Sequence, residues 1–395
     1  MSVGVPLTES SLLDDVQHLA PVLRAHAARC ETDRRLAQPV VDAMREAGLF
    51  RLWVPRAFGG SEVDPMTALR VFEEVSRIDS AAGWNLQLST AIAPFLAWFA
   101  DAGAEEVFRD ANVILGGTLF PPAQAVPVSG GYRVTGRMPF VSGCHSCSWF
   151  IAPALVMDGD QPRLNQAGVP AALIVIYSAK EATIIDNWET LGMRGTGSHD
   201  VAVTDVFVPA RRAASLAPLE KPGKGFEGPL YRYTIWPGVA AVATVPLGIA
   251  RAALDEVIAL AHGKIPAYTG SKLRERPVAQ SQVAQAEALL GAARAYLYES
   301  LRDVWDGAVR GERITPTQKV KIQLAASHAV VASAQAVDLV HAASGTSGIR
   351  NEHRLQQHFR DIHVITQHAF ASASRYESMG KVLFGLPTDW PFFDL

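Results

Sequence analysis

The sequence predicts an α+β protein with an N-terminal α-helical domain, a middle domain built as a β-sheet or barrel, and a C-terminal four-helix bundle. Apolar residues recur at helical spacing up to about residue 101 and again from about residue 231. Between residues 113 and 219 the apolar period changes to two, and glycines and prolines separate the segments. We therefore expect domains at residues 1–112, 113–220 and 221–395.

Composition argues against several classes of partner. The chain has 395 residues, of which 49% are hydrophobic, and a formal net charge of −3, which gives no electrostatic reason to bind nucleic acid or an anionic membrane. No apolar run reaches the roughly 18 residues of a membrane-spanning helix. The first residues do not resemble a secretory signal, and Cys30, Cys144 and Cys147 do not make a disulfide framework. We expect a cytoplasmic protein.

The N-terminal domain reads as a series of helices. Thr8 can cap a first helix, in which apolar residues from Leu12 to Leu23 recur at helical spacing. A second helix covers residues 39–50 and has Gly48 as its C-cap. Further helices are expected at residues 66–79 and 81–99, and the latter is buried because it is apolar on nearly every side.

The middle domain reads as strands. The segments with strand character are residues 113–120, 131–142, 148–157, 171–178, 182–186 and 201–208. The last of them, VAVTDVFV, is a β-branched run that ends at Pro209. It follows a loop, LGMRGTGS at residues 191–198, whose three glycines allow a tight turn.

The C-terminal domain reads as long helices rich in alanine and leucine. The segments are residues 239–262, 278–309, 315–344 and 354–374. Their number and length are typical of a four-helix bundle.

The string LGMRGTGSHDVAVTDVFVP, residues 191–209, resembles the middle domain of the acyl-CoA dehydrogenase fold. The turn at residues 49–60, LFRLWVPRAFGG, resembles a step in the first domain of the same fold. The resemblance covers nearly the whole chain. It implies a flavin between the β domain and the bundle, and a homotetramer in which a neighbouring subunit completes each flavin site.

The dehydrogenase reaction needs a carboxylate to take a proton, and the resemblance locates where it would lie. In most of the family a Tyr-Glu-Gly-Thr string follows an Arg-Asp pair. Here the pair is Arg360-Asp361, and the family spacing puts His368 at the Tyr and Ala369 at the Glu. The alternative position on the first bundle helix is also empty, since no carboxylate occurs between Glu227 and Asp255. Glu377 lies about two helical turns too late.

The string RDIHVITQHAF resembles the flavin-dependent two-component monooxygenases built on this fold. That resemblance implies reduced FAD or FMN supplied by a separate flavin reductase, O2, and a C4a-hydroperoxide that hydroxylates a small aromatic or heteroaromatic substrate, phenolic or indolic. It makes His368 the catalytic imidazole, which would deprotonate or position the substrate. It also makes Ser142 a catalytic residue, whose hydroxyl would lie near flavin N5 and stabilise the peroxide adduct, with Gly143 leaving room for the ring.

Further positions carry over from the resemblance as flavin-binding candidates. They are Trp84, Thr118, Gly345, Thr346 and Ser347, together with Arg274 or Arg276 for the phosphate of a neighbour's flavin. Many relatives also carry a histidine where this chain has Ile92, which puts a two-histidine substrate clamp in doubt. No Gly-x-Gly-x-x-Gly string opens a βαβ unit, so a nicotinamide site is not expected. Cys144 and Cys147 lack a second ligand pair, so we predict no metal.

Aromatic residues suggest an apolar substrate pocket. The candidates are Trp84, Phe95, Trp98, Phe140, Trp149 and Phe370. The C-terminal tail ends in Trp390, Phe392 and Phe393, and an apolar end of this kind should be buried against another subunit or over the mouth of the site. We predict that the tail docks on a neighbouring subunit.

Two other functions stay open at this point. One is an acyl-CoA dehydrogenase-like oxidoreductase with resident FAD and an unrecognised base. The other is a catalytically silent protein that binds flavin or an acyl carrier. The missing glutamate argues against the first, and the presence of both Ser142 and His368 argues against the second.

Overall fold

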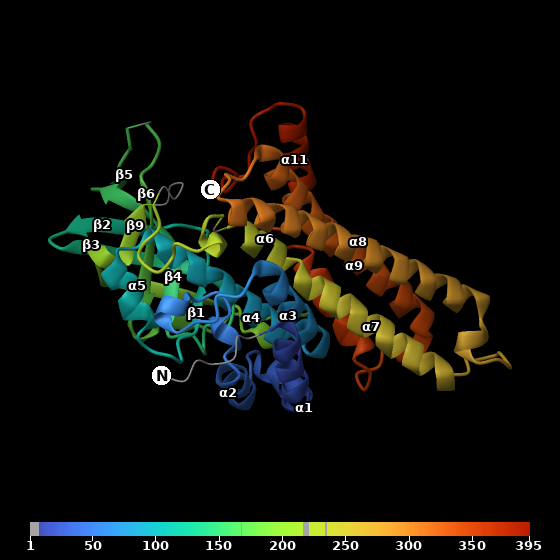
Figure 1. Cartoon of the computed structure of the whole chain (residues 1–395). Helices are drawn as coiled ribbons and strands as arrows, with labels where there is room; N and C mark the ends of the chain where they lie inside the picture. Colours follow the sequence, from blue (N-terminus) through green and yellow to red (C-terminus); the bar gives the residue numbers. More distant parts are fainter. Residues whose placement is uncertain (1–7, 167, 216–220, 234) are drawn as a thin grey trace.

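The structure, a computed structural model, describes residues 8–166, 168–215, 221–233 and 235–395, and it has the predicted fold class. A β-sheet forms one end of the molecule and a helical bundle the other (Figure 1). Helices α3 (Pro65–Ile78) and α4 (Ser80–Ile92) lie between them (Figure 1). The end of the predicted middle domain falls on residues 216–220, outside the described residues.

The N-terminal helices begin where capping residues occur. Thr8 and Ser11 form a capping box at the start of α1 (Glu9–Asp33), as the sequence predicts. Asp79 caps α4 through the backbone N–H of Ala82. The remaining helices here are α2 (Gln38–Glu46) and α5 (Asp101–Phe108), and α5 is missing from the sequence-based assignment.

The middle domain is a mixed sheet with the strand order β7-β8-β3-β2-β4-β6-β9, to which β1 and β5 attach through β4. Its strands are β1 (Leu115–Gly117), β2 (Ala123–Val128), β3 (Gly131–Val141), β4 (Trp149–Asp158), β5 (Gln161–Pro162), β6 (Ala172–Ser178), β7 (Thr183–Ile185), β8 (His199–Pro209) and β9 (Ala213–Ser215). Strands β1 and β2 pair with β4 in parallel, whereas the other pairings are antiparallel.

The sequence-based assignment misses β2, β5 and β9, and it makes β1 too long. In β2 the buried side chains are Ala123 and Ala125, while the strand's other residues are exposed. Two alanines give a weak hydrophobic alternation, and Pro127 argues against a strand. The apolar pattern therefore left this strand undetected.

The pairing of β3 with β8 decides where the candidate site forms. Val141, the last residue of β3, lies opposite His199, the first residue of β8. Ser142 therefore leaves the sheet beside Ser198, the last residue of the glycine-rich loop. Two loops that are far apart in sequence therefore meet at this end of the sheet.

The C-terminal domain is a helical bundle whose helices differ from the predicted segments at two places. It contains α6 (Trp236–Val242), α7 (Thr244–Gly263), α8 (Pro277–Arg310), α9 (Pro316–Ser344), α10 (Leu355–Ile365) and α11 (Ser374–Leu383). The first predicted helix is divided between α6 and α7, because Pro246 has no N–H to donate to Val242.

The last predicted segment, residues 354–374, is also wrong as a single helix. Helix α10 ends at Ile365, and residues 366–373 form turns before α11. The hydroxyl of Thr366 donates to the carbonyl oxygen of His363 at 2.7 Å, which offers the backbone an alternative to the helix. His368 therefore lies in a turn and not on a helix.

The stretch Trp236–Gly263 is long and apolar enough to pass as a membrane span among the described residues, contrary to our reading of the sequence. In the protein, 89% of its apolar window is buried. The stretch is rich in small alanines that pack against the neighbouring helices, so it forms the core of the bundle.

The C-terminal tail packs on its own chain. Trp390 and Phe393 are 6% and 8% exposed. The indole N–H of Trp236 donates to the carbonyl oxygen of Leu395 at 3.0 Å, and the Trp236 and Phe393 rings meet edge to face at 6.0 Å. The apolar end is buried, as expected, and it is buried against its own chain; docking of the tail on a neighbouring subunit stays a prediction.

Asp361 on α10 joins three parts of the chain. Its buried carboxylate accepts hydrogen bonds from the backbone N–H of Met193 at 2.5 Å and from the hydroxyl of Ser80 at 2.6 Å. Met193 belongs to the glycine-rich loop and Ser80 begins α4. A Cβ on Gly192 would collide with the backbone of Arg360, so the loop rests directly on α10.

Replacing Asp361 should therefore destabilise the whole protein. Asp361→Ala leaves the Met193 N–H and the Ser80 hydroxyl buried and unpaired, which costs about 2–4 kcal/mol of unfolding free energy. Asp338→Ala is the matched control, because Asp338 is half exposed and pairs with His363 at 2.9 Å, so its loss costs about 0–1 kcal/mol. Urea unfolding followed by circular dichroism measures both, and equal losses would contradict the role of Asp361.

Candidate functional site

Ser142 lies at the centre of a row of hydrogen bonds. Its hydroxyl accepts from the indole N–H of Trp84 at 3.0 Å and lies 2.7 Å from the hydroxyl of Ser198. Ser198 lies 2.7 Å from the hydroxyl of Thr196, which donates to the carbonyl oxygen of Met193 at 2.7 Å. Sequence reasoning missed Thr196 and Ser198 as site residues, although both lie in the loop that carries the family resemblance.

Gly143 brings bare backbone to the same place. Its φ is +68°, a conformation that a side chain disfavours, and a Cβ there would lie 3.3 Å from the amide of Asn85. Its N–H donates to the carbonyl oxygen of Thr196 at 2.8 Å, and the Asn85 amide donates to the same oxygen at 3.2 Å. These bonds hold the loop after β3 against the loop before β8.

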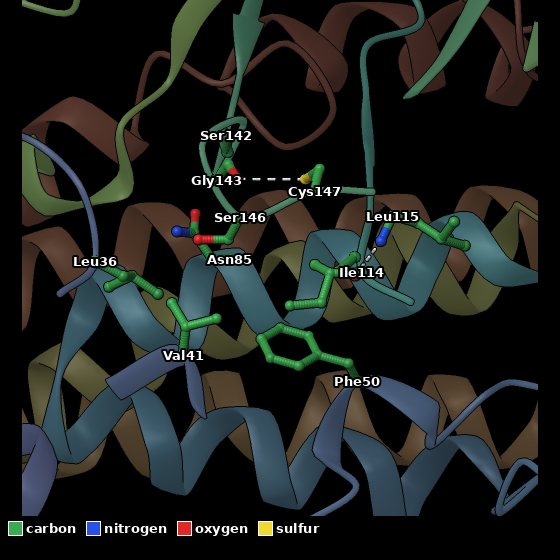
Figure 2. A pocket seen from close by; sticks show the side chains of 11 residues that line it. Leu36, Val41, Phe50, Asn85, Ile114, Leu115, Ser142, Gly143, Ser146 and Cys147 are labelled. Atoms are coloured by element: carbon green, nitrogen blue, oxygen red, sulfur yellow. Dashed lines mark hydrogen bonds between the residues drawn. The ribbon is translucent and has the colours of Figure 1, made fainter. Parts of the chain in front are cut away.

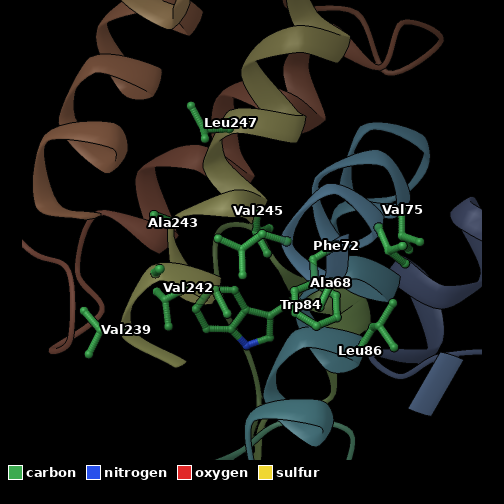
Figure 3. Packing of buried hydrophobic residues seen from close by; sticks show 14 of the residues in the cluster. Ala68, Phe72, Val75, Trp84, Leu86, Val239, Val242, Ala243, Val245 and Leu247 are labelled. Carbon is green, nitrogen blue, oxygen red and sulfur yellow. The ribbon is translucent and has the colours of Figure 1, made fainter. Parts of the chain in front are cut away.

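Trp84 extends from α4 toward the junction of α6 and α7, with Val242 and Val245 beside it (Figure 3). Its side chain is buried, and its ring meets the imidazole of His368 edge to face at 5.0 Å. Because the indole N–H is held by Ser142, the ring has a fixed orientation. Trp84 thus connects the two predicted catalytic residues.

His368 is a neutral imidazole in this position. Burial lowers its pKa to about 4, so the ring carries no charge at pH 7. Its Nδ1 is buried and has no hydrogen-bond partner among the described residues. A neutral imidazole with an unused nitrogen can accept a proton or a hydrogen bond from a bound molecule.

Phe370 fixes the turn that carries His368. The Gln323 amide on α9 donates to the Phe370 carbonyl oxygen at 2.7 Å. The Phe370 ring lies 5.0 Å from Trp390 and 5.3 Å from Phe392, both of the C-terminal tail, and 5.9 Å from His368. The tail therefore packs against Phe370 and supports the turn that carries the histidine.

The other aromatic residues proposed for a substrate pocket lie elsewhere or belong to the core. Phe95 stacks on Trp98, Phe140 is exposed beside Trp188, and Trp149 lies under the guanidinium of Arg212. Trp84 and Phe370 alone of this set contact His368 within the described residues. Alternating apolar patterns cannot distinguish a wall of a site from ordinary core.

The carboxylate that a dehydrogenase requires has no counterpart near His368 within the described part of the chain. Ala369 stands at its family position. The Glu377 side chain is 73% exposed and pairs with Lys381 at 3.3 Å. The chemistry of this site therefore depends on the imidazole.

Thr118 follows β1, which pairs with the start of β4, at the same end of the sheet as Ser142. Its hydroxyl donates to the carbonyl oxygen of Phe120 at 3.0 Å. Ile92, the last residue of α4, is buried and apolar. This chain therefore has no polar side chain at the position where many relatives carry a second histidine.

The remaining flavin candidates lie at the far end of the bundle. Lys264 donates to Ser347 at 2.8 Å in the loop of Gly345 and Thr346. Arg274 contacts His262 at 3.0 Å, also at the end of α7, and Arg276 caps α8. Gln323 contacts Phe370, and Gly345 is 22 residues further along α9, which is roughly 33 Å at 1.5 Å per residue. One chain does not bring these residues to Ser142.

Cys144 and Cys147 are free thiols, and burial raises the pKa of both. Among the described residues no group of three or more His, Cys, Asp or Glu side chains gathers to hold a metal ion. A cavity of about 10 Å³ lies behind Ser142, lined also by Asn85, Ser89 and Cys147 (Figure 2). It is the size of a single water molecule.

The residues around Ser142 fit a flavin ring. Gly143 offers an approach without a side chain, Trp84 an oriented aromatic edge, and His368 a buried nitrogen with no partner among the described residues. The hydroxyl of Ser142 can meet a ring nitrogen. These residues would hold the ring.

Comparison with known proteins places these observations in a family. Residues 10–107 match the acyl-CoA dehydrogenase N-terminal domain and residues 240–373 match the acyl-CoA dehydrogenase C-terminal domain. The chain is 32% identical over 377 residues to an indole-3-acetate monooxygenase of Pseudomonas putida, covering 95% of this chain and 92% of the relative.

Two further proteins are similar to this chain over nearly its whole length. The chain is 28% identical to the oxygenase subunit HsaA, a flavin-dependent monooxygenase of Rhodococcus jostii, covering 93% and 97% of the two chains. It superimposes with a TM-score of 0.89 on XiaF from a Streptomyces species, solved in complex with FADH2 and glycerol, at 26% identity and 97% coverage of both chains.

The depressed pKa of His368 predicts a specific pH dependence of stability. The pKa is about 4 in the folded protein and about 6.5 in the unfolded chain. The unfolded chain therefore binds more protons between these values, and the folded state loses stability as the pH falls from about 6.5 toward 4. We expect His368→Asn to flatten this part of the profile of melting temperature against pH.

His363→Asn is the control, because His363 is partly exposed and pairs with Asp338. It leaves His368 in place, so the loss of stability that His368 causes below pH 6.5 should remain. A His368→Asn protein with the wild-type slope would show that His368 titrates normally and is not held neutral.

Proposed function

The chain belongs to the flavin-dependent monooxygenases of the acyl-CoA dehydrogenase fold, and from this premise we propose that it hydroxylates a small phenolic or indolic compound. It is the oxygenase component of a two-component system, an oxidoreductase that uses reduced flavin and O2. The separate flavin reductase and a cytoplasmic location are part of the proposal. Three free thiols are in keeping with a reducing compartment.

One observation carries the proposal: the position of the dehydrogenase carboxylate is held by Ala369, and the residue before it, His368, supplies a buried neutral imidazole. His368 is held between Trp84 and Phe370, and its Nδ1 has no partner among the described residues. A carboxylate takes an acidic C–H proton, whereas a neutral imidazole suits the O–H of a phenol or the N–H of an indole.

Bound reduced flavin would supply the oxygen atom by reaction with O2. The chain's own residues then have separate tasks. Ser142 and Gly143 would meet the edge of the flavin ring, and Trp84 helps to orient the Ser142 hydroxyl through its indole N–H. His368 would hold or accept the substrate proton at Nδ1. The apolar ring faces of Trp84 and Phe370 exclude water from this nitrogen.

The proposed substrate class rests on the two aromatic rings beside His368. Trp84 and Phe370 present aromatic surface, which suits a flat apolar substrate. The similarity to an indole-3-acetate monooxygenase supports an indole. The choice between FAD and FMN falls to FAD in this proposal, because XiaF, at 26% identity, was solved with FADH2.

Removing the imidazole should uncouple oxygen use from hydroxylation. With a flavin reductase, ¹⁸O₂ and indole-3-acetate, we expect His368→Ala to lose roughly 100-fold in labelled product, the typical contribution of a positioned acid or base. Flavin oxidation should continue. Mass spectrometry of the product and hydrogen peroxide release measure the two routes.

His363→Ala is the matched control, since it removes a histidine five residues away that pairs with Asp338. It should keep wild-type coupling. Equal product from His368→Ala and wild type would contradict the role of the imidazole, and absence of ¹⁸O from all products of the wild type would contradict the monooxygenase itself.

We also propose a homotetramer in which each flavin site uses two chains. Arg274, Arg276 and the loop Gly345–Ser347 lie at the end of the bundle remote from Ser142. Arginine and loop backbone N–H groups suit a phosphate. A neighbour's bundle end would therefore complete the site, as symmetric assemblies allow.

Mixed oligomers test this arrangement. Ser142→Trp fills the ring side of a site, and Arg274→Ala with Arg276→Ala removes the phosphate side, so neither parent should bind flavin tightly. Co-expressed with different tags, the two chains should recover binding at about a quarter of the sites, because random mixing pairs the intact halves that often. Mixed oligomers without recovery would contradict the shared site.

A further inference from the structure

The hydroxyl row Ser142–Ser198–Thr196 has a fixed direction. The Thr196 hydroxyl donates its single hydrogen to the carbonyl oxygen of Met193 at 2.7 Å. At its 2.7 Å contact with Ser198 it must therefore accept, because two oxygens this close without a hydrogen between them repel. The Ser198 hydrogen is thus committed to Thr196.

The same reasoning fixes Ser142. Since the Ser198 hydrogen points to Thr196, the 2.7 Å contact between Ser198 and Ser142 requires the Ser142 hydrogen to point to Ser198. The indole N–H of Trp84 donates to the Ser142 oxygen from another side at 3.0 Å. Ser142 therefore has one oxygen lone pair left and no hydrogen to give.

The row is built to stay in this arrangement. Thr196 and Ser198 are buried, and the Met193 backbone is held by Asp361. The Thr196 carbonyl oxygen is occupied by Gly143 and Asn85, so the loops cannot slide past each other without breaking several bonds. Ser142, at the open end, is the partly exposed member of the row.

From this geometry we infer that Ser198 is a positioning residue that makes Ser142 a hydrogen-bond acceptor only, and thereby selects reduced over oxidised flavin. Reduced flavin carries a hydrogen on N5 that it can donate to Ser142. Oxidised flavin presents a lone pair at N5, which meets the Ser142 lone pair unfavourably. The inference rests on the proposed function, because it needs the ring edge at Ser142.

Anaerobic binding titrations of both redox forms of FAD test the inference without turnover. In Ser198→Ala the Ser142 hydrogen is released and can turn to N5 of the oxidised ring. We expect the ratio of the dissociation constants for oxidised and reduced FAD to fall on the order of five- to tenfold, the effect of one hydrogen bond. Ser198→Thr keeps a hydroxyl at the position and should keep a ratio near the wild-type value.

A double variant separates this role from a merely structural one. Adding Ser198→Ala to Ser142→Ala should leave the ratio unchanged, because the only group that Ser198 orients is then gone. A wild type that prefers reduced FAD, with the same ratio in Ser198→Ala, would overturn the inference and leave the proposed function standing. A wild type that binds neither form, or prefers the oxidised form, would overturn both.

Discussion

The site depends on one buried carboxylate. Asp361 accepts from the backbone of the glycine-rich loop and from the first residue of α4, and it lies on the helix that leads to His368. Three elements of the site are connected to it: the loop beside Ser142, the helix of Trp84 and the turn of His368. Burial raises the pKa of Asp361, while its two hydrogen bonds favour the ionised form. The two donors, the Ser80 hydroxyl and the Met193 N–H, satisfy the carboxyl oxygens that burial removes from water.

The register of β3 with β8 adds the second constraint. It puts the residue after one strand beside the residue before the other, and so it builds a row of hydroxyls from two separate loops. Trp84, on α4, donates its indole N–H to Ser142 at the end of this row, and this hydrogen bond orients the ring that meets His368 edge to face. The proposed oxygenase chemistry needs no ionised base here, since the group assigned to the flavin is the neutral hydroxyl of Ser142 and the group assigned to the substrate is the neutral imidazole of His368. This is how a fold whose dehydrogenases use a carboxylate can serve a different reaction.

Much of this could be predicted from the sequence, for identifiable reasons. The string from Leu191 to Pro209 and the residues around Arg360 and Asp361 carry the family resemblance, so the fold followed, and Ser142 and His368 could be named as candidates. The turn around His368 could not be predicted, because the helical apolar pattern continues over residues 354–374. The interactions that end the helix, the Thr366 hydroxyl bond and the packing of Phe370 on the C-terminal tail, do not show in that pattern. The strand β2 was missed because its buried residues are alanines. Ser198 and Thr196 were invisible as site residues, because only the register of two strands shows what they touch.

The most direct measurement of the central claim is stopped-flow absorbance after mixing the protein and pre-reduced flavin with oxygenated buffer. The account predicts an absorbance transient, distinct from both reduced and oxidised flavin, that Ser142→Ala shortens by roughly tenfold, as the loss of one hydrogen bond of about 1.4 kcal/mol would. Direct return to oxidised flavin at the rate of the free cofactor, with or without Ser142, would contradict it.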